Sequence, residues 1–381
     1  MRSYVVGGAV RDALLGMPVK DHDHVVVGAT PEQMLRAGYR AVGKDFPVFL
    51  HPRTQEEYAL ARTERKTAPG YHGFAFHAAP DVTLEQDLIR RDLTINAMAR
   101  DEDGSIVDPY GGQRDLAARL FRHVSDAFAE DPVRILRTAR FAARFADFSV
   151  APDTNALMRR MVEAGEVDAL VSERVWQELA RGLMEATPSR MFAVLRDCGA
   201  LARVLPELDA LWSVPGAEDG GVHALWVVDH AAAHDYPIEV RFAALVLALD
   251  VGAIAGLAKR LKAPNECRDL ALMTAREQGN VCAALALDAE ALVTLFERCD
   301  GFRKPERFIQ MLQAVACGAC AGGDDAQSWS PGMRLQQGLV AARAVNAGAV
   351  AQGCGADKAR IPLAVHAARV DAVQSVLVQA G

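Results

Sequence analysis

The chain has 381 residues, of which 51% are hydrophobic and 24% charged, and its mean hydropathy is +0.04. This composition indicates a globular protein of two or three domains. No stretch of 18 apolar residues is free of charges, and the start MRSYVVGGAVRD is soon interrupted by Arg-Asp, so we expect neither a membrane span nor a signal peptide. The net charge of −7 argues against a protein that coats nucleic acid indiscriminately, although a nucleic-acid enzyme needs only a local basic patch. Seven scattered cysteines favour a reducing cytoplasm over a disulfide framework.

Short strands and helices are predicted to alternate at the start of the chain. Strands are expected at residues 3–7, 19–28, 39–43, 46–51 and 56–61. A short helix is expected over residues 9–16, with Gly16 as its stop, and another begins at the N-cap Thr30, which Pro and Gln follow at the first and third helical positions. The polar, glycine-containing stretch RTERKTAPGYHGFAF (62–76) predicts a mobile loop.

From about residue 112 onward the pattern changes to alanine- and leucine-rich helical periodicity, with a weak break near Pro215. The predicted fold class is therefore α+β, with a small mixed-sheet head followed by a long all-helical neck and body. We expect three domains, at residues 1–115, 116–215 and 216–381.

Two carboxylates stand two residues apart in the predicted strand at residues 19–28. Residues i and i+2 of a strand point the same way, so Asp21 and Asp23 would project side by side and repel each other unless a cation lies between them. A hard divalent ion such as Mg²⁺ is the natural partner, and two such ions can act on both oxygens of a phosphoryl transfer. The preceding Gly7-Gly8 permits close approach of a triphosphate, and Arg11 can add a phosphate contact. The alternative is a tight turn followed by a solvated acidic strand.

A second cluster lies in LIRRDLTINAMA, residues 88–99. Arg91 is placed to hold a nucleotide phosphate or sugar, with Asp92 orienting it. The alternative is a salt-bridge cluster at the start of a helix.

A third cluster lies in EDPVRILRTARFAARF (130–145), where Pro132 marks a helix start. At 100° per residue, four arginines share one face of this helix and apolar residues form the opposite face. The four are Arg134, Arg137, Arg140 and Arg144. The alternative interpretation of this stripe is a solvated basic face.

Asp131 and Arg134 together match the edge of a nucleobase. Cytosine and adenine each present an amino donor beside a ring-nitrogen acceptor, so a carboxylate accepts from the amine and a guanidinium donates to the ring nitrogen. Uracil and guanine present an acceptor in place of the amine. The pair therefore predicts acceptance of C and A and rejection of U and G without a nucleic-acid template.

Taken together, GGAVRD followed by KDHD, RRDLTINAMA and EDPVRILRTARFAARF resemble the motifs of the bacterial CCA-adding tRNA nucleotidyltransferases, of the DNA-polymerase-β-type superfamily. The resemblance covers residues 1–215 and implies addition of C, C and A to tRNA from CTP and ATP, with Mg²⁺. By motif match, the metal ligands and catalytic residues are Asp21 and Asp23. The nucleotide-binding positions are Gly8, Arg11, Arg91, Arg137 and Arg140, with Asp131 and Arg134 at the base. The loop 62–76 resembles the flexible loop used when switching to A, and Glu57 is a further acid for the metal site.

The predicted body departs from part of this family. Many relatives carry a metal-binding His-Asp phosphohydrolase site, but here His234-Asp235 lies at a helix end. At the position where relatives place the pair, this chain has Leu247-Ala248. We therefore expect no phosphohydrolase activity and a body that holds tRNA. A candidate phosphate-contacting patch consists of Lys259, Arg260, Lys262 and Arg268. The alternative is a solvated face.

Two other functions stay open at this point. A poly(A) polymerase of the same superfamily would share the chemistry of the head. A catalytically silent RNA-binding protein would keep only the fold, although the intact Asp21, Asp23 and Arg11 argue against it.

Overall fold

The structure is a computed structural model that describes residues 1–19, 21–42, 48–66, 74–213, 220–320, 328–355 and 357–379. The chain divides into two compact units. The first comprises Met1–Glu178 with Ala193–Val204, and the second Leu179–Phe192 with Leu205–Gly381. The first unit contains the predicted head and most of the segment 116–215; the boundaries at residues 115 and 215 stay predictions.

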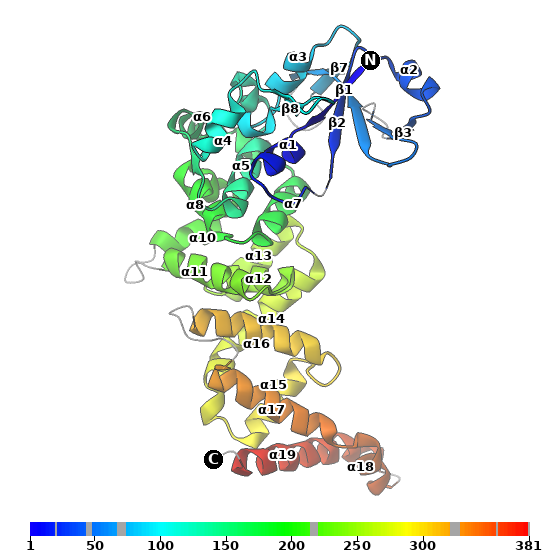
Figure 1. The fold of residues 1–381 in the computed structure, drawn as a ribbon. Helices are drawn as coiled ribbons and strands as arrows, with labels where there is room; N and C mark the ends of the chain where they lie inside the picture. Colours follow the sequence, from blue (N-terminus) through cyan, green and yellow to red (C-terminus); the bar gives the residue numbers. More distant parts are fainter. Residues whose placement is uncertain are drawn as a thin grey trace. The chain divides into compact units, whose positions relative to one another are not determined.

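A seven-stranded mixed sheet of order β3-β4-β5-β2-β1-β8-β9 lies in the first unit (Figure 1). Its strands are β1 (Arg2–Val6), β2 (Asp23–Val27), β3 (Arg40–Val42), β4 (Val48–Leu50), β5 (Glu57–Leu60), β8 (Ala99–Arg100) and β9 (Ile106–Val107). β2 and β5 are parallel, and the other neighbouring pairs are antiparallel. All five predicted strands are confirmed, and β2 is the central strand of the sheet.

The helices around the sheet are α1 (Gly8–Leu14), α2 (Pro31–Arg36) and α3 (Leu84–Ile89). The chain leaves α1 through Gly16 at φ +68°, which confirms the predicted stop. Thr30 accepts from the N–H of Gln33, and the Gln33 side chain accepts from the N–H of Thr30, so the predicted capping box is confirmed.

The prediction of a loop over residues 62–76 is wrong for the part that the structure describes. β6 (Thr63–Lys66) and β7 (Phe74–His77) form an antiparallel pair, with Thr63 opposite His77. The backbone groups of each strand are paired by the other, so the polar composition of the stretch does not prevent strand formation. Residues 67–73 lie outside the described residues.

Helices dominate the rest of the first unit, as predicted. They are α4 (Gly112–Ala117), α5 (Val133–Arg144), α6 (Pro152–Glu163), α7 (Ser172–Leu183), α8 (Ser189–Asp197) and α9 (Ala200–Val204), of which α7 and α8 continue into the second unit. One short parallel pair, β10 (Leu120–Phe121) and β11 (Ser149–Val150), precedes and follows α5 in the chain. The rings of Phe121 and Phe148 stack with centroids 5.1 Å apart, which fixes both ends of the α5 segment on one apolar core.

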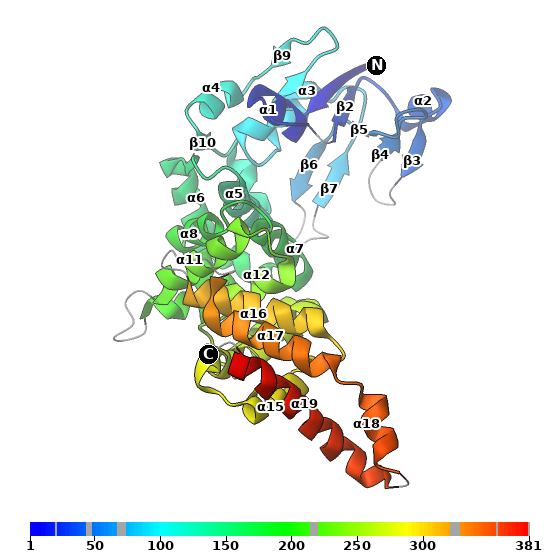
Figure 2. The same cartoon turned by 60° about the horizontal axis from the view of Figure 1, so that its bottom comes forward.

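The second unit is helical throughout its described residues. Its helices are α10 (Pro206–Asp209), α11 (Gly220–Ala233), α12 (Ile238–Leu245), α13 (Val251–Leu261), α14 (Asn265–Cys282), α15 (Ala289–Arg298), α16 (Pro305–Ala319), α17 (Ser330–Ala344), α18 (Ala347–Gly353) and α19 (Ile361–Gln379). α12 packs against α11, α14 and α16, and Phe242 is fully buried there. α17 and α19 lie side by side (Figure 2).

One helix of the described chain, Lys358–Val378, is long and apolar enough to cross a membrane by length and composition alone. The sequence analysis did not expect such a segment, because Arg369 and Asp371 interrupt its apolar residues. A single helix of this kind is weak evidence for a membrane span. Here it packs on α15, where the ring of His366 contacts the carboxylate of Glu297 at 3.0 Å.

Candidate active site

The turn between β1 and α1 brings Arg91 against the backbone of Gly7. Gly7 has φ +70°, which favours glycine, and a Cβ there would lie 2.9 Å from Nη1 of Arg91. The sequence needs a glycine at this position for two reasons, the backbone conformation and the close approach of a guanidinium.

The two carboxylates project from the central strand into solvent. Asp23 is the first residue of β2, and Asp21 lies two residues before it. The observed strand therefore begins later than the predicted start at residue 19. Both are exposed, whereas His22 and His24 are half-buried, as expected if alternate residues point to opposite faces. The register pairs Asp23 with Glu57, which is also exposed. Neither aspartate side chain forms a hydrogen bond or ion pair with any residue that the structure describes.

The donor set of this edge fits a divalent cation. No three His, Cys, Asp or Glu side chains of the described ranges group closely enough to hold a metal by themselves. Mg²⁺, however, typically binds one or two carboxylates and completes its shell with substrate phosphates and water. Asp21 and Asp23 offer oxygen ligands of this kind.

Arg11 is buried, at 3% exposure, among protein atoms. Its Nε donates to Asp12 at 2.8 Å, and its Nη1 donates to Asn96 at 2.6 Å. The guanidinium also lies 5.1 Å from the ring centroid of Phe141 and 5.0 Å from that of Phe145. The predicted contact of Arg11 with phosphate stays a prediction. The structure shows instead that Arg11 connects α1 to the segment 94–96 through its hydrogen bond to Asn96.

The prediction that Asp92 orients Arg91 is wrong. Arg91 pairs with Asp87, one turn earlier on α3, at 3.2 Å, and Arg90 pairs with the same carboxylate at 2.7 Å. Burial alone would raise the pKa of Asp87, but the charges of Arg91 and Arg90 hold it below its usual value. The alternative of a salt-bridge cluster therefore describes the contacts of Arg91, but the cluster lies at the end of α3 and not at the start of a helix.

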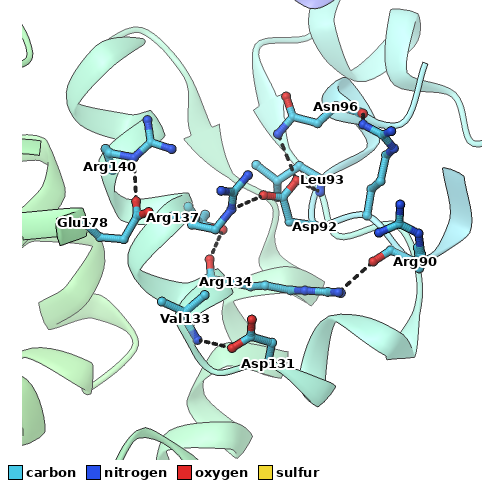
Figure 3. A network of polar contacts seen from close by, with 12 residues as sticks. Arg90, Asp92, Leu93, Asn96, Asp131, Val133, Arg134, Arg137, Arg140 and Glu178 are labelled. Carbon is cyan, nitrogen blue, oxygen red and sulfur yellow. Dashed lines mark hydrogen bonds and ion pairs between the residues drawn. The ribbon is translucent and has the colours of Figure 1, made fainter. Parts of the chain in front are cut away.

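Asp92 instead connects the segment 92–96 to α5 (Figure 3). Its carboxylate accepts from Nε of Arg137 at 2.7 Å, from Nδ2 of Asn96 at 3.0 Å and from the N–H of Leu93 at 2.8 Å. Burial alone would raise the pKa of Asp92, yet the charge of Arg137 and these hydrogen bonds hold it well below its ordinary range. Asp92 is therefore an ionised anchor for α5.

The arginine face of α5 is not a solvated basic face. Arg134 is only 8% exposed, and the other three arginines each pair with an acid of the first unit. The pairs are Arg137 with Asp92, Arg140 with Glu178 at 2.6 Å, and Arg144 with Asp12 at 2.8 Å. Glu178 was not identified from the sequence, although its position on a helix rich in charges gives a weak signal.

Asp131 and Arg134 stand together at the start of α5 but contact different partners. Pro132, predicted to be the first helical residue, is the N-cap of α5, so the helix begins one residue later, at Val133. The Asp131 carboxylate accepts from the N–H of Val133 at 3.1 Å and from two nitrogens of Arg174. Arg134 donates to the backbone carbonyl of Arg90 at 2.7 Å (Figure 3). It also donates to the backbone carbonyl of Ala127 at 2.9 Å. Arg174 was not identified from the sequence.

His234 and Asp235 of the second unit, which the sequence analysis named, contact neighbouring side chains of the same unit. His234 follows the last residue of α11, as predicted, and its ring stacks on Tyr236, while Asp235 pairs with Arg241. Leu247 and Ala248 line a cavity of about 290 Å³. The absence of phosphohydrolase activity stays a prediction.

The basic patch of the second unit is partly paired. Arg260 pairs with Glu207, and Arg268 pairs with Asp269 at 2.7 Å. Lys259 and Lys262 are exposed. Their contact with tRNA stays a prediction.

An acid-bearing central strand, a glycine turn and a charged helix occur together in the first unit, as expected for the head of a nucleotidyltransferase. Residues 3–122 match the family model described as the poly A polymerase head domain, and residues 147–211 match the probable RNA and SrmB-binding site of polymerase A. The multifunctional CCA proteins of Burkholderia cenocepacia (strain HI2424) and Azoarcus sp. (strain BH72) are each 61% identical to 99% of this chain, which covers 99% and 97% of their own lengths. The crystal structure of the Bacillus stearothermophilus CCA-adding enzyme in complex with CTP is similar, with a TM-score of 0.71 and 25% identity over 98% of this chain and 89% of that chain.

The chain belongs to the family of the CCA-adding tRNA nucleotidyltransferases. The chain is an enzyme. These similarities confirm the family, the fold class and the activity that the motifs indicated, and they exclude the silent RNA-binding protein. The full-length likeness to CCA proteins also decides against the poly(A) polymerase. Membership of this family implies the use of a divalent metal ion.

Proposed function

We propose that this enzyme adds and repairs the 3′-terminal CCA of tRNA from CTP and ATP, without a nucleic-acid template and with release of pyrophosphate. The observation that carries the proposal is that one compact unit holds both an exposed carboxylate pair on its central strand and the pair Asp131 and Arg134 at the start of α5. The first supplies the means of nucleotidyl transfer and the second the means of choosing a base.

Asp21 and Asp23 would hold Mg²⁺, with Glu57 as a further acid on the neighbouring strand. When bound, two such ions would neutralise charge on the attacking and leaving oxygens of the transferred group. The two carboxylates are not paired with other described residues, so their charge is available for this purpose.

The nucleotide would lie along the glycine turn and the charged face of α5. Gly8 and Arg91 border the turn, and the side chain of Arg137 is 37% exposed although it also pairs with Asp92. Arg11 and Arg140 are more deeply buried, and they would act by holding α1 and α5 in place. Asp131 would accept from the exocyclic amine, and Arg134 would donate to the ring nitrogen.

The test uses tRNA transcripts that end before the first C, or after the second C, with each labelled nucleotide supplied singly and in pairs. We expect two C additions followed by one A, loss of all incorporation after chelation of divalent metal, and its return with Mg²⁺. Long A tails would support a poly(A) polymerase instead. The absence of incorporation under every condition would contradict the proposal.

A further inference from the structure

Asn96 is a buried amide that stands between two charged groups of the first unit. It is the last residue of the short 3₁₀ helix Thr94–Asn96 and is 6% exposed. Its Oδ1 accepts from Nη1 of Arg11 at 2.6 Å, and its Nδ2 donates to the carboxylate of Asp92 at 3.0 Å. The amide thus has its acceptor against a cation and its donor against an anion, and the reverse orientation would oppose both contacts.

These hydrogen bonds belong to a chain of contacts that crosses the proposed nucleotide site. At one end, Arg11 lies on α1, directly after the glycine turn. At the other end, Asp92 accepts from Nε of Arg137 on α5 at 2.7 Å (Figure 3). The backbone carbonyl of Asn96 also accepts from Nη1 of Arg91 at 3.5 Å, and this nitrogen lies close to the glycine turn. Asn96 therefore connects the turn to the charged face of α5.

The contacts of Asn96 require an amide of this length. An aspartate would keep the acceptor for Arg11, but it would place a second carboxylate 3.0 Å from Asp92, and the two would repel each other. A leucine of similar size would offer neither hydrogen bond, although both partners are buried, and buried polar groups that lose a partner are costly.

We propose that Asn96 is a positioning residue that fixes the spacing between the glycine turn and Arg137, and that it sets the affinity for the incoming nucleotide without choosing the base. The turn and α5 would hold different parts of one nucleotide, so both sets of contacts form fully only when their spacing matches it. Base choice is separate, because the hydrogen bonds of the Asp131 carboxylate go to Val133 and Arg174. The inference rests on the proposed placement of the nucleotide along the turn and α5.

The experiment compares Asn96→Leu, Asn96→Asp, Arg137→Ala and the double variant Asn96→Leu/Arg137→Ala. The measurements are kcat and KM for CTP and UTP on tRNA lacking CCA, for ATP and GTP on tRNA ending in CC, and KM for each tRNA. We expect KM for CTP and for ATP to rise about tenfold in both Asn96 variants, with unchanged KM for tRNA. The C-to-U and A-to-G ratios of kcat/KM should stay as in the wild type.

The double variant tests the coupling directly. Arg137 can contribute its full share only while its spacing from the turn is kept. We therefore expect KM in the double variant to be close to that of the more affected single variant, rather than the product of the two increases.

Asn155→Leu and Asn155→Asp are the matched controls. Asn155 is a half-buried amide on α6 of the same unit, and its Oδ1 has no hydrogen-bond partner among the described residues. These variants should leave every KM unchanged. A second connection between α1 and α5, the pair Arg144 and Asp12, should keep the Asn96 variants folded, which urea denaturation checks.

The outcomes separate the inference from the proposed function. If Arg137→Ala raises KM for CTP and ATP while the Asn96 variants change only kcat, the inference is overturned and the nucleotide placement stands. Independent increases in the double variant would also overturn it. An unchanged KM in Arg137→Ala would overturn the placement and the inference together. If Asn96→Leu does not fold, Asn96→Asp takes its place in the single and the double variant, and the same outcomes decide.

Discussion

The two halves of the proposed site differ in how far the protein neutralises their charges. On the central strand, Asp21 and Asp23 are exposed and pair with no other described residue. On α5 and its neighbours, Asp92 is buried and paired with Arg137. The first half needs a ligand to balance its charge, whereas the second is arranged before a nucleotide arrives. Substitutions in the two halves should therefore affect different properties of the enzyme.

The largest expected effect is in the exposed half. Asp21→Ala or Asp23→Ala removes a metal ligand, so incorporation of both C and A should fall by at least about a thousandfold. Because each side chain is exposed, the free energy of unfolding should change by less than about 0.5 kcal/mol. Single-turnover incorporation and urea denaturation measure the two quantities.

Glu163→Ala is the control for this pair, because Glu163 is an exposed carboxylate of the same unit, at the end of α6. It should change neither quantity. An Asp23→Ala enzyme that keeps more than a tenth of the activity would show that the metal is held elsewhere.

The next effect is in the buried half and concerns stability. Asp92→Asn leaves the charge of Arg137 without its carboxylate, and we expect a loss of about 2–4 kcal/mol in the free energy of unfolding. This is less than for a fully buried pair, because the Arg137 side chain is 37% exposed. Activity should fall as well, since α5 loses its anchor. A variant as stable as the wild type would break the distinction between the two halves.

The pH dependence of this loss has a defined sign. The folded pKa of Asp92 lies below its ordinary value, near 3.9 in unfolded chains, so its contribution is complete above about pH 4 and is lost as the pH falls further. The difference between wild type and Asp92→Asn should therefore be larger at pH 6 than at pH 3. Urea unfolding at the two pH values measures it, and a difference that grows toward low pH would contradict the assignment.

A smaller effect is expected in base selection. Arg134→Ala removes the donor to cytosine N3 and adenine N1, so discrimination against U and G should weaken by about 1–3 kcal/mol. Two backbone carbonyls also lose their donor, so stability falls too, and the ratios of kcat/KM among the four nucleotides are the informative measurement. Arg159→Ala is the control, since Arg159 also donates to a backbone carbonyl, that of Asp197. Ratios unchanged from the wild type would place base recognition elsewhere.

Local features of the fold could be predicted from the sequence. The capping box at Thr30, the stop at Gly16 and the five strands depend on neighbouring residues, and all are confirmed. The alternation of Asp21 and Asp23 with two histidines likewise follows from strand geometry.

The partners of buried charges could not be predicted in this way. Asp92 pairs with Arg137, 45 positions away, rather than with the adjacent Arg91. Asp131 pairs with Arg174, 43 positions away. Such choices depend on which helices pack together, and no spacing rule within one element gives them. The paired strands β6 and β7 were missed for a related reason, because polar composition indicated a loop while the backbone pairing between them decides the structure.

The smallest expected effect extends the comparison to the second unit, where we predict no metal chemistry. Leu247 and Ala248 stand at the position of the phosphohydrolase pair, and neither side chain can ligate a cation. The purified enzyme should release no phosphate from cyclic nucleotides or small phosphoesters with Ni²⁺ or Mn²⁺, and His234→Ala should leave CCA addition unchanged, because its ring stacks on Tyr236 within the second unit. An Asp23→Ala background separates the two sites, since it removes the proposed metal edge of the first unit alone. Metal-dependent turnover that persists in Asp23→Ala and disappears in His234→Ala would reveal a second metal site and would end the assignment of all metal chemistry to the exposed edge of the sheet.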